Sequence, residues 1–133
     1  MKGLSVLLGA AGLILMHPLV AQAAKLSVAG RVELTSQESP VSNARVTITF
    51  HGHELGIHEY TTERTIRART DEFGNFRAEI KVPDRRYSWT HTTVEIGETE
   101  VSKRTSLISA CQIDGTGGCR FDKSLQVNPL NSP

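Results

Sequence analysis

The chain has 133 residues and carries 15 Lys and Arg against 14 Asp and Glu, which gives a formal net charge of +1; this length fits one domain. Because the charges are balanced and mixed in sign, they give no electrostatic reason to expect binding to nucleic acid or to an anionic membrane. We therefore expect neither as a partner.

Residues 1–23 have the features of a secretory signal peptide. Lys2 supplies a positive charge, and residues 4–16 form an apolar stretch that is short for a bilayer span. The small residues at 21–23, Ala-Gln-Ala, suit a signal peptidase. We expect a signal-peptide helix that is cleaved after Ala23, no stable membrane insertion afterwards, and a periplasmic or secreted protein. An uncleaved membrane anchor is the alternative.

The first part of the mature chain alternates apolar and polar residues, which is the period of a half-buried strand. This pattern predicts strands over residues 25–35 and 44–50. Gly30 in the first of them marks a bulge or a close approach of another chain segment. A further strand is expected within residues 59–70, where four threonines and the absence of a 3.6-residue stripe disfavour a helix.

The stretch over residues 70–83 has the clearest pattern. It begins with a tight-turn cluster at 71–75, in which Gly74 can adopt a positive φ without a Cβ clash. Alternation then predicts a strand over 76–82, and Pro83 ends it because proline has no N–H to donate. We expect this turn to set the register of a hairpin with the preceding strand.

The remaining residues give weaker signals. Tyr87 and Trp89 are spaced to share a strand face, and residues 92–96, 105–109 and 120–127 are further candidate strands. Seven or eight short strands separated by turns, with no helix beyond the leader, predict an all-β fold: an antiparallel β-sandwich domain over residues 24–128. Residues 129–133 are expected to be a frayed tail.

Both cysteines, Cys111 and Cys119, lie in the part expected to be exported. In an oxidising compartment, an even number of closely spaced cysteines indicates a disulfide. Three glycines between the two cysteines let the chain turn back, and Asp114-Gly115 is expected at the apex of this loop. Redox-active pairs more often have C-x-x-C spacing, which is absent here.

Three blocks of the mature chain match one pattern in order: V-x-G-x-V at 28–32, P-V-x-x-A-x-V-x-I at 40–48, and T-D-x-x-G-x-F at 70–76. They resemble the carboxypeptidase regulatory-like family, within the transthyretin-like (prealbumin-like) sandwiches. Glu38-Ser39 stand where that family often has Gly before Pro-Val, and the last third of the chain has no counterpart in the pattern. The resemblance implies a seven-stranded Greek-key sandwich and no reaction, because such modules are mostly non-catalytic.

A histidine cluster occupies residues 51–58, HGHELGIH. Imidazole and carboxylate ligands suit Zn(II) or Cu(II), so we consider a metal site formed by His51, His53 and His58, with Glu54 or His91 as a fourth ligand. The alternative is a solvated polar loop, because clustered histidines are only a compositional hint.

Two further sets of side chains have a functional and a structural interpretation. Tyr87 and Trp89 are candidates for a sugar- or peptide-binding surface, whereas packing at the edge of the core is the more common role of a single Trp. Several arginines would form a basic stripe if the third and fourth strands pair, and two glutamates would turn that stripe into an ion-pair ladder. These residues are Arg64, Arg67, Arg69 and Arg77, with Glu63 and Glu79.

Enzymes that share this kind of sandwich are not matched. Hydroxyisourate hydrolases end in Tyr-Arg-Gly-Ser, whereas residues 130–133 are Leu-Asn-Ser-Pro. Intradiol dioxygenases place a His-x-His after their iron-binding tyrosines, whereas His51 and His53 precede Tyr60 and Tyr87. No nucleophile–base pair can be assembled either. We therefore expect a non-catalytic accessory or interaction module with a protein partner, and a periplasmic copper- or zinc-binding protein as the alternative.

Overall fold

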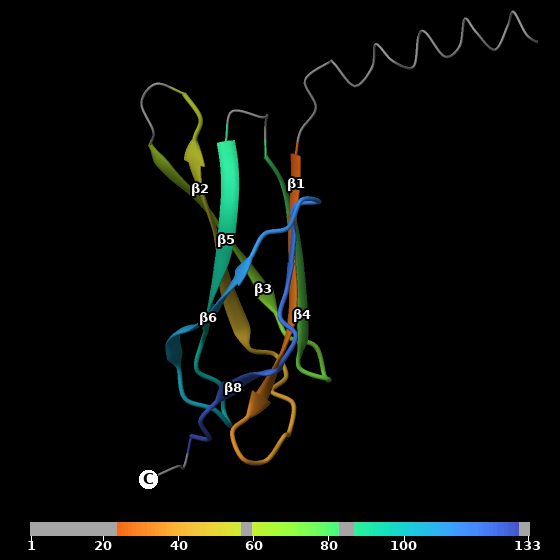
Figure 1. Cartoon of the computed structure of the whole chain (residues 1–133). Helices are drawn as coiled ribbons and strands as arrows, with labels where there is room; N and C mark the ends of the chain where they lie inside the picture. Colours follow the sequence, from red (N-terminus) through yellow and green to blue (C-terminus); the bar gives the residue numbers. More distant parts are fainter. Residues whose placement is uncertain (1–23, 57–59, 83–86, 131–133) are drawn as a thin grey trace, which may run out of the picture.

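The computed structural model describes residues 24–56, 60–82 and 87–130, which form eight β-strands in two sheets (Figure 1). This part of the chain contains no helix, so the all-β prediction is confirmed for it, and none of it is a helix able to cross a membrane. The predicted signal peptide with its cleavage site, Pro83, His58 and residues 131–133 lie outside the described residues.

The strands are arranged in two four-stranded sheets. One sheet has the order β4-β1-β7, with β8 also pairing with β1, and the other has the order β3-β2-β5-β6. The bounds are β1 (Ala24–Leu34), β2 (Arg45–Glu54), β3 (Thr61–Arg69), β4 (Asn75–Val82), β5 (Tyr87–Ile96), β6 (Thr105–Gln112), β7 (Gly118–Arg120) and β8 (Leu125–Val127).

The hydrophobic core draws alternating side chains from both sheets, as expected for two layers with one apolar face each. Val46, Ile48 and Phe50 on β2 are fully buried, as their alternation predicts. The other buried apolar residues are Leu26, Val28, Val32, Leu34, Val41, Ala44, Phe76, Val82, Val94, Ile96, Cys119, Leu125 and Val127. The described part thus agrees with the predicted β-sandwich.

One pairing pattern differs from the prediction of a purely antiparallel fold. The β1–β4, β2–β3, β2–β5 and β5–β6 pairs are antiparallel, but β7 and β8 both run parallel to β1. The physical reason is the tight turn after β6, in which Asp114 N donates to Gly118 O at 2.8 Å. This turn reverses the chain as it crosses between the sheets, and so fixes the direction in which β7 reaches β1.

The turn over residues 71–75 forms as predicted, but it does not close a hairpin. It joins β3 to β4, and these strands belong to different sheets, so the predicted hairpin is wrong. Asp71 Oδ1 accepts hydrogen bonds from the N–H groups of Phe73 and Asn75, both at 2.9 Å. Gly74 has φ 80°, and a Cβ there would lie 2.5 Å from the Val32 carbonyl oxygen.

Gly30 is a point of close approach, as expected. It pairs with Phe76 across β1 and β4, and a Cβ on Gly30 would lie 2.6 Å from the Phe76 ring. The Phe121 ring is next to them, with its centroid 6.4 Å from that of Phe76. The sequence motifs that contain Gly30, Gly74 and Phe76 therefore contribute to packing and turn geometry.

Two strand predictions need correction in the second half of the chain. Tyr87, Trp89 and residues 92–96 belong to one strand, β5. The register shifts opposite His51 and Gly52, so the residues that face the core have odd numbers up to Trp89 and even numbers from Thr92 onward. The predicted strand over 120–127 is instead two short strands, β7 and β8. The tail is not frayed at its start, since Pro129 forms a β-bridge with Ser102 and Leu130 N donates to Val101 O at 2.9 Å.

Candidate functional site

The face of the β3-β2-β5-β6 sheet that is turned away from the core carries most of the candidate residues; we call it the outer face. By register it has two polar regions. His51 on β2 lies between Glu63 on β3 and His91 on β5. Nearer to the start of β2, Arg45 lies beside Arg69 of β3.

The histidine region is ordered by contacts to both neighbouring strands. The His51 and His91 rings are stacked, with centroids 4.5 Å apart and planes within 4°. His51 Nδ1 lies 3.3 Å from Glu63 Oε2, and His51 Nε2 lies 2.8 Å from the Thr93 hydroxyl. Both ring nitrogens of His51 therefore have protein partners, and a metal ion would have to displace one of them.

Only part of the predicted set of metal ligands lies within the described residues. His51 and His53 have the same parity on β2 and share the outer face, whereas His58 lies outside the described residues. Among the described residues, no group of three or more His, Cys, Asp or Glu side chains is placed to hold a metal ion. His91, considered only as a fourth ligand, is the imidazole that contacts His51.

The predicted basic stripe and its ion-pair ladder are wrong, because β3 and β4 are in different sheets. Arg77 of β4 is therefore separated from the arginines of β3. The two glutamates have other partners: Glu63 lies beside His51, and Glu79 Oε1 is 4.0 Å from Lys25 Nζ.

Four arginines instead surround one concave region of the outer face, which we call the arginine hollow. Its volume is about 620 Å³. It is lined by Asn43, Arg45, Thr47, Arg67, Arg69, Glu95, Gly97, Glu98 and Arg104. Arg69 is held by Asn43, since its Nη1 donates to the Asn43 backbone oxygen at 3.1 Å and to Oδ1 at 3.3 Å. Arg104 Nη2 lies 3.7 Å from Glu95 Oε2.

The sequence contains a signal for this cluster in the spacing of the arginines on β2 and β3. A β2–β3 hairpin centred near residue 57 places Arg45 opposite Arg69 and Thr47 opposite Arg67, which is the register observed. The approach of Arg104 was not predictable in the same way, because it depends on the irregular pairing of β5 with β6.

A second hollow adjoins the arginine hollow at the same end of the molecule. It has a volume of about 610 Å³ and shares Asn43 and Glu98 with the first. Glu100 and Val101 line it too. Leu130 N donates to Val101 O at 2.9 Å, and these two side chains are 40% and 50% exposed. The arginine hollow is therefore next to a hollow that contains two glutamates and one exposed valine, with Leu130 bonded to that valine.

Tyr87 and Trp89 contact each other on β5, with ring centroids 5.9 Å apart. Trp89 is partly buried and packs against the core, and its ring lies over Gly52, where a Cβ would be 2.9 Å away. The structure therefore places Trp89 at the edge of the core, which is the structural alternative considered above.

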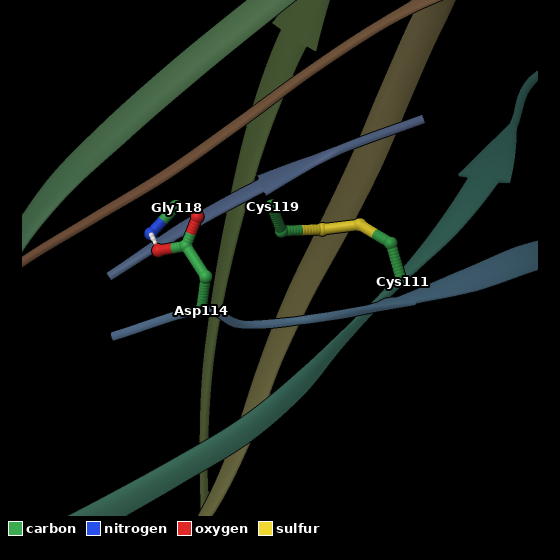
Figure 2. The surroundings of a disulfide bond; sticks show 4 residues. All are labelled: Cys111, Asp114, Gly118 and Cys119. Carbon is green, nitrogen blue, oxygen red and sulfur yellow. Dashed lines mark hydrogen bonds between the residues drawn. A yellow bond between two sulfur atoms is a disulfide. The ribbon is translucent and has the colours of Figure 1, made fainter. Parts of the chain in front are cut away.

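The cysteine loop has the expected form (Figure 2). Cys111 of β6 and Cys119 of β7 are joined by a disulfide, with a Cα–Cα distance of 5.8 Å. Asp114 lies at the turn, and its Oδ1 accepts from the Thr116 hydroxyl at 2.6 Å and from the N–H groups of Thr116 and Gly118 at 2.8 and 3.1 Å. The hydrogen bond from the Thr116 hydroxyl is the main cause of a pKa of Asp114 below its ordinary value, followed by the backbone bond from Gly118.

The edge strands of the two sheets differ in their charge. β3 contains Glu63 and three arginines, and β4 contains Arg77, Glu79 and Lys81. Such charges discourage the addition of a further strand. β7 and β8 have three residues each. β6 has eight residues, none of them charged and none of them proline, and its Leu107 is 61% exposed.

Comparison with known proteins does not assign a family. No family model matches the chain, and no curated protein matches it. A crystal structure of a 9R-lipoxygenase from Cyanothece PCC8801 is similar over 84% of this chain, with a TM-score of 0.42 and 14% sequence identity. The chain covers 18% of that lipoxygenase chain. This degree of likeness carries no conclusion about fold or function.

Proposed function

We propose that this protein is an exported, non-catalytic module with a Greek-key, transthyretin-like sandwich of the carboxypeptidase regulatory-like kind. It would act as an accessory or interaction subunit for another protein in the periplasm or outside the cell. The intramolecular disulfide supports an oxidising compartment. The positions of Gly30, Gly74 and Phe76 at close contacts support the family resemblance, because those motif residues have a structural role here.

The observation that carries the proposal is the uncharged edge strand β6. An extended partner segment can add to a free sheet edge through backbone hydrogen bonds, with specificity supplied by alternate side chains. Ile113 N donates to Thr90 O at 2.9 Å, and β5 and β6 pair antiparallel. By the alternation of an antiparallel ladder, Cys111 directs its backbone groups toward β5, whereas Ala110 and Gln112 direct theirs away from the sheet.

This geometry predicts a specific effect of proline at residue 110. Ala110→Pro removes one outward N–H while leaving the β5–β6 hydrogen bonds in place, so we expect recovery of a crosslinked protein partner to fall about tenfold or more. The measurement is crosslinking of the protein in its native compartment, followed by purification and quantitative mass spectrometry.

Ala110→Val is the matched control, because valine keeps the N–H and suits a strand. It should retain partner recovery, and both variants should keep the melting temperature of the wild type within a few degrees. Equal recovery with Ala110→Pro, or no protein recovered above background with the wild type, would refute pairing at this edge.

Binding of Cu(II) or Zn(II) at the outer face is the second candidate function. The register favours it, because His51 and His53 share the outer face of β2 and His91 is paired with His51 on the neighbouring strand. A ligand that binds only the folded state stabilises it, by about 2.7 kcal/mol at a hundredfold excess over Kd. We therefore expect a thermal shift with either metal that is absent in His51→Ala/His53→Ala. An equal shift in that variant would assign any binding to other residues.

A further inference from the structure

We propose that the arginine hollow is a docking site for acidic side chains of a protein partner. This inference rests on the proposed interaction function, and it names a second surface and the chemistry that this surface recognises. It concerns a part of the sheet distinct from the outward edge of β6.

The charge of the arginine hollow is the first argument. Four arginines line it together with two glutamates, Glu95 and Glu98, so positive charge is in excess by two. Arg45 and Arg69 are directly opposite one another on neighbouring strands, an arrangement that is unfavourable for like charges. A carboxylate placed between them would relieve this repulsion.

The second argument is that two guanidinium groups are available. Within residues 24–56, 60–82 and 87–130, Arg45 and Arg67 have no hydrogen bond or ion pair from their side chains, whereas Arg69 and Arg104 are held by Asn43 and Glu95. Two oriented arginines and two free ones therefore line the same hollow. Guanidinium groups match carboxylates in a bidentate manner, and such charge-assisted hydrogen bonds are stronger than those between neutral groups.

The surroundings favour a protein over other anions. The neighbouring hollow shares Asn43 and Glu98 with the arginine hollow and presents exposed Val101, with Leu130 bonded to it. Protein interfaces combine apolar and charged groups in this way. A sulfated polysaccharide or a lipid headgroup would use the arginines but not the apolar neighbours. Glu100 lines the neighbouring hollow but not the arginine hollow, so the acidic end of the partner segment would lie over the arginines.

The test measures binding of a short fluorescein-labelled peptide, a run of glutamates followed by a pair of leucines, by fluorescence anisotropy. We expect Arg45→Glu/Arg67→Glu to weaken binding about tenfold or more, and Arg45→Gln/Arg67→Gln to weaken it less, because neutral side chains do not repel the peptide. Binding to the wild type should fall as salt is raised.

Arg64→Glu is the matched control. Arg64 is an exposed arginine on β3, the strand that carries Arg67. Its side chain has the opposite parity to Arg67 and does not line the arginine hollow. It should change the affinity less than about twofold, as rim charges outside a contact do. Thermal melts of all variants show whether each is folded, and the glutamine variant remains informative if the glutamate variant is not.

Three results would overturn the inference: no peptide binding by the wild type, equal affinity in the wild type and Arg45→Gln/Arg67→Gln, or tighter binding of anionic lipid vesicles or heparin than of the peptide. Ala110→Pro should leave peptide affinity unchanged, since residue 110 does not line the arginine hollow. Failure of pairing at β6 and failure of this docking site are therefore observed separately.

Discussion

Gly74→Ala should lower the free energy of unfolding by about 2–4 kcal/mol, as the sum of backbone strain and overpacking. Gly74 has φ 80°, a conformation that disfavours any residue with a Cβ, and its added methyl group would meet the backbone carbonyl of Val32. The Gly74 carbonyl also accepts from Val32 N at 2.8 Å, so the turn cannot move away without losing that hydrogen bond. Urea unfolding measures the change as a lower midpoint with an unchanged slope.

Gly115→Ala is the control for this prediction. Gly115 does not have a positive φ, and no atom of residues 24–56, 60–82 or 87–130 lies within 4 Å of the place where its Cβ would be. Alanine there should be neutral or slightly stabilising, by up to about 1 kcal/mol, because it lowers the conformational entropy of the unfolded chain. If both variants unfold at the same urea concentration, the turn at 71–75 does not restrict the backbone as described.

Replacing both cysteines by alanine should destabilise the protein by about 2–3 kcal/mol, the lower part of the usual range, because the disulfide closes a short loop. The bond joins β6 of one sheet to β7 of the other. β7 has only three residues and pairs only with β1, so it should be among the first segments to open without the bond. The readouts are urea unfolding and amide hydrogen exchange.

Reduction of the wild type separates the lost covalent bond from lost burial. Cys119 is buried, and alanine in its place leaves some apolar contact unfilled. Dithiothreitol should lower the free energy of unfolding of the wild type by most of the difference between the wild type and the double alanine variant. It should leave the double alanine variant unaffected. A wild type whose stability does not respond to the reductant after the bond is broken would show that the loop contributes little.

The parts of the fold that were predictable are those set by local pattern. Alternation along β2 assigned Val46, Ile48 and Phe50 to the core, where they are fully buried. The turn at Gly74 was predictable for a similar reason, because its positive φ is a property of a few adjacent residues.

Pairing between distant segments was not predictable from pattern. A turn followed by an alternating strand looks the same whether it closes a hairpin or carries the chain to the opposite sheet, as the 71–75 turn does. The register shift opposite His51 also changed the parity within β5, which made one strand resemble two. The candidate site could be predicted only in part for the same reasons. His51 was identified from the sequence, but its contact with His91 depends on the pairing of β2 with β5.

The parallel pairing of β8 with β1 has a consequence for how the chain reaches its native state. Thr35, directly after β1, donates its hydroxyl to the backbone oxygen of Val127 at the end of β8, 92 residues later, at 3.1 Å. β1 thus gains β8 as a neighbour only after residues 125–127 have been synthesised. Contacts of such large sequence separation slow folding, because loop closure must precede them. We expect β1 to be held mainly by β4 until β8 pairs with it.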